Sequence, residues 1–309
     1  MGSITASTLT IILTVEFMIG NLGNGFIALV NSIDWAKGRK ISSIDQILTF
    51  LAISRIALLW LMFINWCVLM SNPLLLTRGK ILNMFYAGWI VTSHFSIWLA
   101  TCLSTFYFLK IANFSNSIFL YLKWRVKKVV SVLMLVTLIP LFCNIVLVNT
   151  FIDAWIDGCK RNMTCMSNSV QFLKRPLITS TMFTFIPFAM TLTTFFLLIF
   201  SLCKHLRTMQ RDAQGPRDAS TKAHITVLQS VITFLLLYAI FFLSYFIAVL
   251  ISDLVNENMI FMFLQATAIV FPSGHSYVLI LGNNKLRQAS VLCLWWLKCR
   301  WKDNDPSGS

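Results

Sequence analysis

Residues 50–60 read FLAISRIALLW, an apolar run with one arginine, Arg55, near its centre. Apolar residues on both sides extend the run from residue 44 to residue 70. At about 1.5 Å per helical residue, this length crosses about 30 Å of hydrocarbon. A charged side chain at that depth costs at least ~2.5–3.5 kcal/mol. We therefore expect Arg55 to have a partner, or a task, inside a bundle of helices.

The composition of the whole chain is that of a membrane protein. The 309 residues are 57% hydrophobic and 12% charged, and the mean hydropathy is +0.76. Residues 177–203 and 225–251 contain no Asp, Glu, Lys or Arg, which excludes a soluble helical domain. The sequence predicts an all-α membrane protein in one domain, residues 1–309, with a tail at 283–309 and a bundle of seven transmembrane helices. The predicted spans are approximately 5–31, 44–70, 81–109, 129–152, 177–203, 225–251 and 259–282.

The distribution of basic residues predicts the orientation of the bundle. With the N-terminus outside, eighteen Lys and Arg residues fall on the inner side and six on the outer side. The first span lacks a basic start and is too long for a signal peptide, so it is expected to be a retained helix. The net charge of +14 then faces anionic membrane lipids, and no nucleic acid is needed to explain it.

Counting from the inner edge of the membrane places three polar residues at one depth. Asn24, Arg55 and His275 each lie ten residues, about 15 Å, into the bundle. We expect Arg55 to donate to the side-chain oxygen of Asn24 and to acceptors around His275 and Ser276. Glu16 lies about 12 Å further out and points away from Arg55, so we reject an ion pair between them. This polar layer either locks helices together, or takes part in switching, or does both.

Several ordered motifs resemble one receptor family. The third helix ends in FYFLKIANFS (106–115), and the seventh carries PSGHSYVLILGNNKLRQ (272–288), where rhodopsin-like receptors have other signatures. These segments resemble the type 2 taste receptors, the bitter taste receptors among the G-protein-coupled receptors. Further matching segments are IGNLGNGFIALVN (19–31), DQILTFLAISR (45–55), HFSIWLAT (94–101), LLIFSLCKH (197–205), DASTKAH (218–224) and FLLLYAIFFLS (234–244). Ser93, Cys203 and FPSGHSY (271–277) depart from the usual family pattern.

The resemblance implies a plasma-membrane, multi-pass receptor. It would detect bitter small molecules in an outer transmembrane pocket and activate a heterotrimeric G protein of the gustducin or Gi type. The outer halves of the helices are apolar and aromatic with few polar groups, which suits varied lipophilic ligands. The candidate ligand-binding residues are Asn65, Trp66, Trp89, Ser93, Phe241, Tyr245 and Gln265. Trp89 and Gln265 match family positions that commonly touch agonists, although packing alone also explains any one of these aromatic residues.

The inner face is basic and aromatic. The resemblance assigns the G protein to this face, and the candidate residues are Lys110, Lys123, Arg125, His205 and Lys222. Lys110 also fits a simpler role as a cation at a helix C-terminus. Residues 286–302 mix Trp with Lys and Arg, which predicts a short amphipathic helix lying on the membrane after the seventh span. Palmitoylation of Cys293 or Cys299 is left open.

The sequence gives no sign of catalysis, of a cofactor or of a metal site. The four histidines fall on different helices and depths, and His94 and His275 are expected to be hydrogen-bonded within the bundle. The protein is therefore expected not to be an enzyme. The alternatives are a chemosensory receptor of another class and a seven-helix transporter or channel. A transporter should show internal repeats or several midplane carboxylates, and this chain offers only Glu16.

The predicted loop between the fourth and fifth spans carries two features of an extracellular segment. Asn162 begins the glycosylation sequon NMT (162–164) on the outer side, whereas the second sequon, at Asn113, faces the cytoplasm. Cys159 and Cys165 share the outer loop, and the sequence fits either a local disulfide or two free thiols.

Overall fold

The computed structural model describes residues 2–71, 79–161, 169–212, 219–251 and 257–303. This part of the chain is helical almost throughout, as the composition predicts. The helices are α1 (Gly2–Ala36), α2 (Ser43–Ser71), α3 (Gly79–Ile111), α4 (Ser117–Trp124), α5 (Val126–Val136), α6 (Leu138–Arg161), α7 (Ser169–Asp212), α8 (Ala219–Ile251), α9 (Glu257–Gly282) and α10 (Asn284–Asp303).

Four described stretches are long and apolar enough to cross a membrane by length and composition alone. They are Ser7–Ala36, Ser43–Val68, Val126–Gly158 and Ile178–Lys204. The described parts of α8 and α9 add the shorter apolar segments Ile232–Ser244 and Ala266–Gly282. Large apolar side chains are exposed along these helices, for example Phe142, Phe200 and Leu236. The chain is therefore a helical membrane protein.

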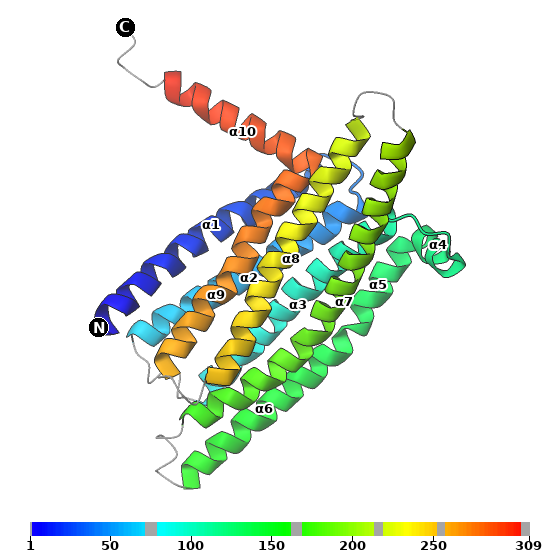
Figure 1. Cartoon of the computed structure of the whole chain (residues 1–309). Helices are drawn as coiled ribbons and strands as arrows, with labels where there is room; N and C mark the ends of the chain where they lie inside the picture. Colours follow the sequence, from blue (N-terminus) through cyan, green and yellow to red (C-terminus); the bar gives the residue numbers. More distant parts are fainter. Residues whose placement is uncertain (1, 72–78, 162–168, 213–218, 252–256, 304–309) are drawn as a thin grey trace.

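The long helices run beside one another, and two short ones leave the bundle (Figure 1). α3 packs against α2, α5, α6 and α7, while α9 packs against α1, α2, α8 and α10. The N-terminus lies at one end of the bundle, and α4 and α10 lie at the opposite end. Because α3 and α9 each have neighbours on several sides, the side chains that they turn inward lie in the core.

The arrangement of α2 explains the arginine in FLAISRIALLW. Residues at helical spacing form a buried stripe on this helix: Leu48, Leu51, Ala52, Arg55, Leu58, Leu59 and Met62. The other residues of the run point outward, with Phe50, Ile53 and Trp60 all at least half exposed. Arg55 is 0% exposed, so it lies in the interior of the bundle and not toward lipid.

α1 and α9 approach each other closely through small residues. A Cβ on Gly20 would overlap Ser273, and a Cβ on Gly23 would overlap Ser276. Such close approach brings backbone acceptors of α1 within reach of α9 side chains. Ser273 Oγ donates to the Glu16 carbonyl at 3.0 Å, and Tyr277 Oη donates to the Ile19 carbonyl at 3.0 Å.

Two details of the fold add to the predicted spans. The segment between the third and fourth predicted spans contains α4, whose first turn is capped by the Asn116 side chain accepting from the Ile118 amide at 2.8 Å. The predicted span 129–152 is divided into α5 and α6 at Thr137. Pro140 accounts for this break, because its ring clashes with the carbonyl four residues earlier and it offers no amide hydrogen.

Candidate functional site

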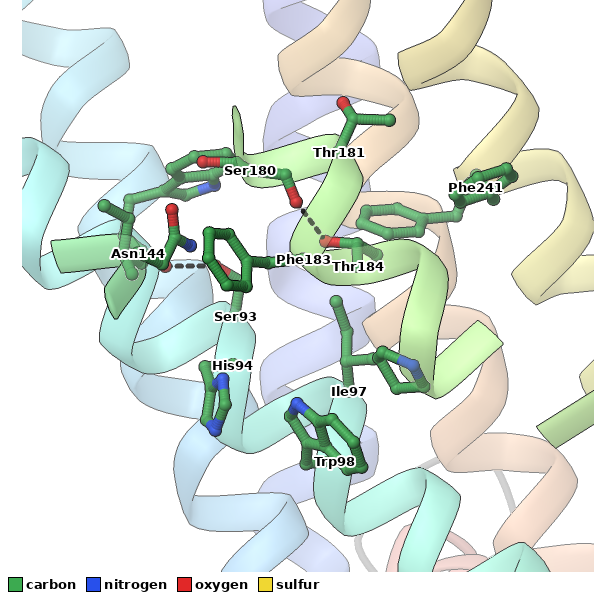
Figure 2. Close-up of a pocket in the computed structure, with 14 residues that line it drawn as sticks. Ser93, His94, Ile97, Trp98, Asn144, Ser180, Thr181, Phe183, Thr184 and Phe241 are labelled. Carbon is green, nitrogen blue, oxygen red and sulfur yellow. Dashed lines mark hydrogen bonds between the residues drawn. The ribbon is translucent and has the colours of Figure 1, made fainter. Parts of the chain in front are cut away.

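Two inward-facing stripes, one on α3 and one on α7, form the walls of a cavity. Trp89, Ile90, Ser93, His94, Ile97 and Trp98 recur at intervals of three and four along α3 and therefore share one face. On α7 the same spacing brings together Ser180, Thr181, Phe183, Thr184 and Pro187. Asn144 of α6 and Phe241 and Phe242 of α8 complete the lining. Figure 2 shows these side chains around one space.

This α3/α6/α7 cavity is narrow, and its lining mixes Trp and Phe with uncharged polar and aliphatic side chains. Its volume is about 30 Å³, enough for about two water molecules. A larger ligand therefore requires the lining side chains to move apart. A smaller adjoining space of about 10 Å³ shares Trp89, Ser93, Ile97 and Phe241 and reaches Leu58 of α2 and other residues of α2 and α9. The cavity thus has one arm toward α6 and another toward α2 and α9.

The arm toward α6 contains buried polar atoms that have no protein partner. Among the described residues, none hydrogen-bonds to His94 Nε2, Asn144 Oδ1 or Ser180 Oγ. Leaving such a buried group unpaired costs about 1–3 kcal/mol. The described part of the chain thus leaves these groups available to water or to a bound molecule.

Other polar groups around the cavity are used within their own helices. Ser93 Oγ donates to the Trp89 carbonyl, and Thr184 Oγ1 donates to the Ser180 carbonyl at 2.8 Å (Figure 2). No Asp, Glu, Lys or Arg is among the described residues that line this cavity. The cavity therefore suits an uncharged molecule, because an ion buried there would have no countercharge.

The structure brings together some of the predicted ligand-binding residues. Trp89, Ser93 and Phe241 line the α3/α6/α7 cavity. Trp66 of α2 is 2% exposed and lies in the core of the bundle. Asn65, its neighbour in the chain, is half-buried. Neither residue lines the α3/α6/α7 cavity or its smaller adjoining space. The sequence reasoning missed Asn144 and Ser180, although a polar residue inside an apolar span such as LFCNIVLVN (141–149) is a signal that could have identified Asn144.

Arg55 of α2 meets His275 of α9 across the bundle. Its Nη2 donates to His275 Nδ1 at 2.6 Å, and its guanidinium carbon lies 5.3 Å from the centre of the Phe271 ring. A guanidinium group has only donors, so Nδ1 is the acceptor and a neutral His275 carries its proton on Nε2. Arg55 and Glu16 are both among the described residues, and they form no ion pair with each other. Glu16 Oε2 is buried and has no hydrogen-bond partner among the described residues.

The expected hydrogen bond from Arg55 to Asn24 is not formed. Asn24 turns its amide nitrogen to the Pro272 carbonyl of α9 at 3.1 Å, and its Oδ1 has no partner among the described residues. Ser276 is fully buried, and its hydroxyl donates to the Ser273 carbonyl at 2.7 Å. The polar layer thus joins α2 to α9 and α1 to α9 through separate contacts.

A second cavity lies beside His275, on the side of the bundle toward α4 and α10. Its volume is about 70 Å³. The residues that line it are Ala100, Leu103, Ser104, Tyr107, Phe195, Phe234, His275, Val278, Leu279 and Gly282. The imidazole of His275 therefore accepts the hydrogen bond from Arg55 and also lines this cavity between α3, α7, α8 and α9.

The predicted inner-face cations have different surroundings. Lys110 is exposed at the end of α3, whereas Lys123 of α4 donates to the Ala112 carbonyl at 2.8 Å, just beyond that end. Arg125 is exposed, with its guanidinium carbon 5.0 Å from the centre of the Tyr121 ring. Lys123 thus connects α4 to the end of α3, and Lys110 and Arg125 remain accessible to a partner.

Some sequence predictions fall outside what the structure describes. The side chains of Tyr245, Gln265, His205, Lys222 and Cys159 are outside it, as are residues 162–168, which include Asn162 and Cys165. Cys293 and Cys299 are free thiols on α10.

Comparison with known proteins identifies the family. The model of the family "Taste receptor protein (TAS2R)" matches residues 1–298. Taste receptor type 2 member 14 of Papio hamadryas is 58% identical over 311 aligned residues, covering 100% of this chain and 98% of the relative. The human protein of the same name is also 58% identical with the same coverage, and Taste receptor type 2 member 140 of Rattus norvegicus is 54% identical over 94% of each chain. This chain therefore belongs to the taste receptor protein family and is a receptor, not an enzyme.

Proposed function

We propose that this protein is a seven-helix receptor of the plasma membrane that binds bitter small molecules in the outer half of its bundle. It would then activate a heterotrimeric G protein of the gustducin or Gi type at the opposite face. The α3/α6/α7 cavity carries the proposal, since its lining mixes Trp and Phe with uncharged side chains and it lies in a chain 58% identical to taste receptors of type 2.

The course of α3 supports communication between the two faces. Trp89 lies at the cavity, and Lys110 lies at the other end of the same helix. The Lys123 contact to Ala112 attaches α4 to that end. A shift of α3 would therefore also move α4. An agonist drives such a shift only if it binds the active arrangement more tightly than the resting one.

Calcium mobilisation in cells that express the full chain tests the function. Panels of bitter compounds should raise calcium when a gustducin-type chimeric G protein is present. Trp89→Ala should raise the EC50 about tenfold or change agonist selectivity, because truncation of a large aromatic lining residue removes apolar contact. Trp60→Ala is the matched control, because Trp60 is half exposed on α2 and away from the cavity.

Two results would contradict this proposal. One is an agonist response that persists in cells lacking every G-protein α-subunit, which would point to a transporter or channel. The other is a Trp89→Ala receptor that responds to all agonists like the unmodified protein.

Substitutions of the exposed residues in 116–128 should lower the maximal signal and leave agonist binding in place.

Glycosylation tests the proposed orientation. With the N-terminus outside, the sequon at Asn162 lies outside the cell and Asn113 lies inside. Glycosidase treatment should increase the gel mobility of the unmodified protein and of Asn113→Gln, but not that of Asn162→Gln. A mobility change that persists in Asn162→Gln, or no change in the unmodified protein, would count against this orientation.

A further inference from the structure

We propose that the arm of the α3/α6/α7 cavity beside α6 is a subsite for a neutral aromatic ligand bearing a hydrogen-bond donor, with Asn144 and Ser180 as specificity-determining residues. The subsite rests on the proposed ligand cavity and narrows its ligand class. A phenol is the simplest compound with the required groups.

Asn144 is unusual in its surroundings. Its neighbours where α3 meets α6 include the buried apolar residues Ile90, Val148 and Ile152, and a hydrogen bond from Asn83 Nδ2 to Asp153 Oδ1 at 3.1 Å joins the same two helices further along. Asn144 is 8% exposed, and its Oδ1 has no partner among the described residues. Polar side chains inside membrane bundles commonly hydrogen-bond across helices, but this amide oxygen does not link α6 to a neighbour. Its oxygen is therefore available to a ligand.

Ser180 and His94 place two more hydrogen-bonding atoms at the same cavity. Ser180 is 5% exposed, and its hydroxyl oxygen is unpaired among the described residues. His94 Nε2 is also unpaired there. Three elements, α3, α6 and α7, thus each contribute one unsatisfied polar group to the same lining.

The chemistry of these groups selects the ligand. Asn144 Oδ1 accepts hydrogen bonds, and the Ser180 hydroxyl both donates and accepts. Such a set favours an O–H or N–H group on the ligand. Trp98 and Phe183 line the same arm and suit a flat ring (Figure 2). The lack of charged residues in the described lining disfavours carboxylates and ammonium groups.

Three probes separate these features: 2-naphthol, its ether 2-methoxynaphthalene, and the carboxylate 2-naphthoate. They are applied to cells that express the full receptor with a gustducin-type chimeric G protein. We expect the unmodified receptor to respond to 2-naphthol at about tenfold lower concentration than to the ether, and least to 2-naphthoate. The ether retains the ring and loses only the donor.

Two variants and one control assign the preference to the subsite. Asn144→Leu conserves side-chain size, and Ser180→Ala removes only the hydroxyl. Asn144→Leu should reduce the tenfold preference for the phenol to about twofold or less while leaving the ether's EC50 and the surface amount of receptor unchanged. Ser180→Ala should give a smaller reduction. Thr150→Val is the control on α6, because Thr150 is exposed and its hydroxyl bonds within its own helix.

The possible outcomes are distinct. Equal potency of phenol and ether in the unmodified receptor would overturn the subsite, as would a preference that survives Asn144→Leu. Loss of surface receptor in Asn144→Leu, with the ether response falling in parallel, would show a structural role and also overturn it. If other bitter compounds activate the receptor and no naphthalene does, the ligand class is wrong while the proposed function stands. If no compound gives a signal that depends on the G protein, the proposed function itself fails.

Discussion

Replacing Arg55 with alanine should remove most of the folded receptor from the cell surface and abolish signalling. The side chain is 0% exposed, and its Nη2 donates to His275 Nδ1 at 2.6 Å. Alanine leaves a cavity and removes the donor to His275 Nδ1, and a buried polar group left unpaired costs about 1–3 kcal/mol. Domains are stable by only about 5–15 kcal/mol, so this loss is large. An epitope tag counted on intact cells measures surface receptor, and calcium mobilisation measures signalling.

Arg55→Lys tests whether charge alone is sufficient. A lysine keeps the positive charge but has a compact ammonium group in place of the planar fork that reaches His275. We expect its surface amount to lie between those of the unmodified protein and Arg55→Ala. A lysine variant indistinguishable from the unmodified protein would show that the guanidinium geometry is irrelevant.

Glu16→Gln is the matched control for the polar layer. Glu16 is an acidic residue of α1 that makes no ion pair with Arg55, so the variant should leave surface receptor close to the unmodified amount. In a double-mutant cycle, Arg55 should couple to His275 by about 1 kcal/mol or more and to Glu16 by close to zero. A Glu16–Arg55 coupling above ~1 kcal/mol would show that the two residues pair in the membrane.

The contrast between Arg55 and Asn24 shows what the sequence can predict about this layer. Residue counting gives depth, because each helical residue advances the chain by about 1.5 Å. It therefore predicted that Arg55 would lie near His275. Counting does not give the rotation of each helix or the orientation of an amide. The amide nitrogen of Asn24 donates to the Pro272 carbonyl, and the amide oxygen accepts no hydrogen bond from Arg55.

The cavity illustrates the same limit. Aromatic and polar residues in the outer halves of the helices indicated Trp89, Ser93 and Phe241, which do line it. Asn144 and Ser180 were not predicted, because their place depends on how α6 and α7 rotate toward α3. The break at Thr137 sets the start of α6. Pro140 marks the break in the sequence but not the resulting direction.

Placing a valine at Gly23 should separate α1 from α9 and strongly reduce the amount of folded receptor. A Cβ at this position would lie 3.1 Å from Ser276 Cβ and 3.1 Å from Tyr277 Cε2, closer than carbon atoms normally approach. Overpacking of this kind costs about 1–3 kcal/mol. Valine adds two further methyl groups, so the helices must move apart. That movement would break the bond from Tyr277 Oη to the Ile19 carbonyl.

Gly25→Val is the control for the substitution itself, because it has the same chemical change two residues along the same helix. A Cβ on Gly25 would meet nothing within 4 Å. Because both variants replace a glycine of α1 with valine, the change in helix propensity is similar in the two. Only the packing against α9 differs between them. Surface counts and the melting temperature of the detergent-purified receptor should fall for Gly23→Val and stay near the unmodified values for Gly25→Val. Equal losses in the two variants would mean that helix propensity, and not the close approach of α1 to α9, is what these glycines provide.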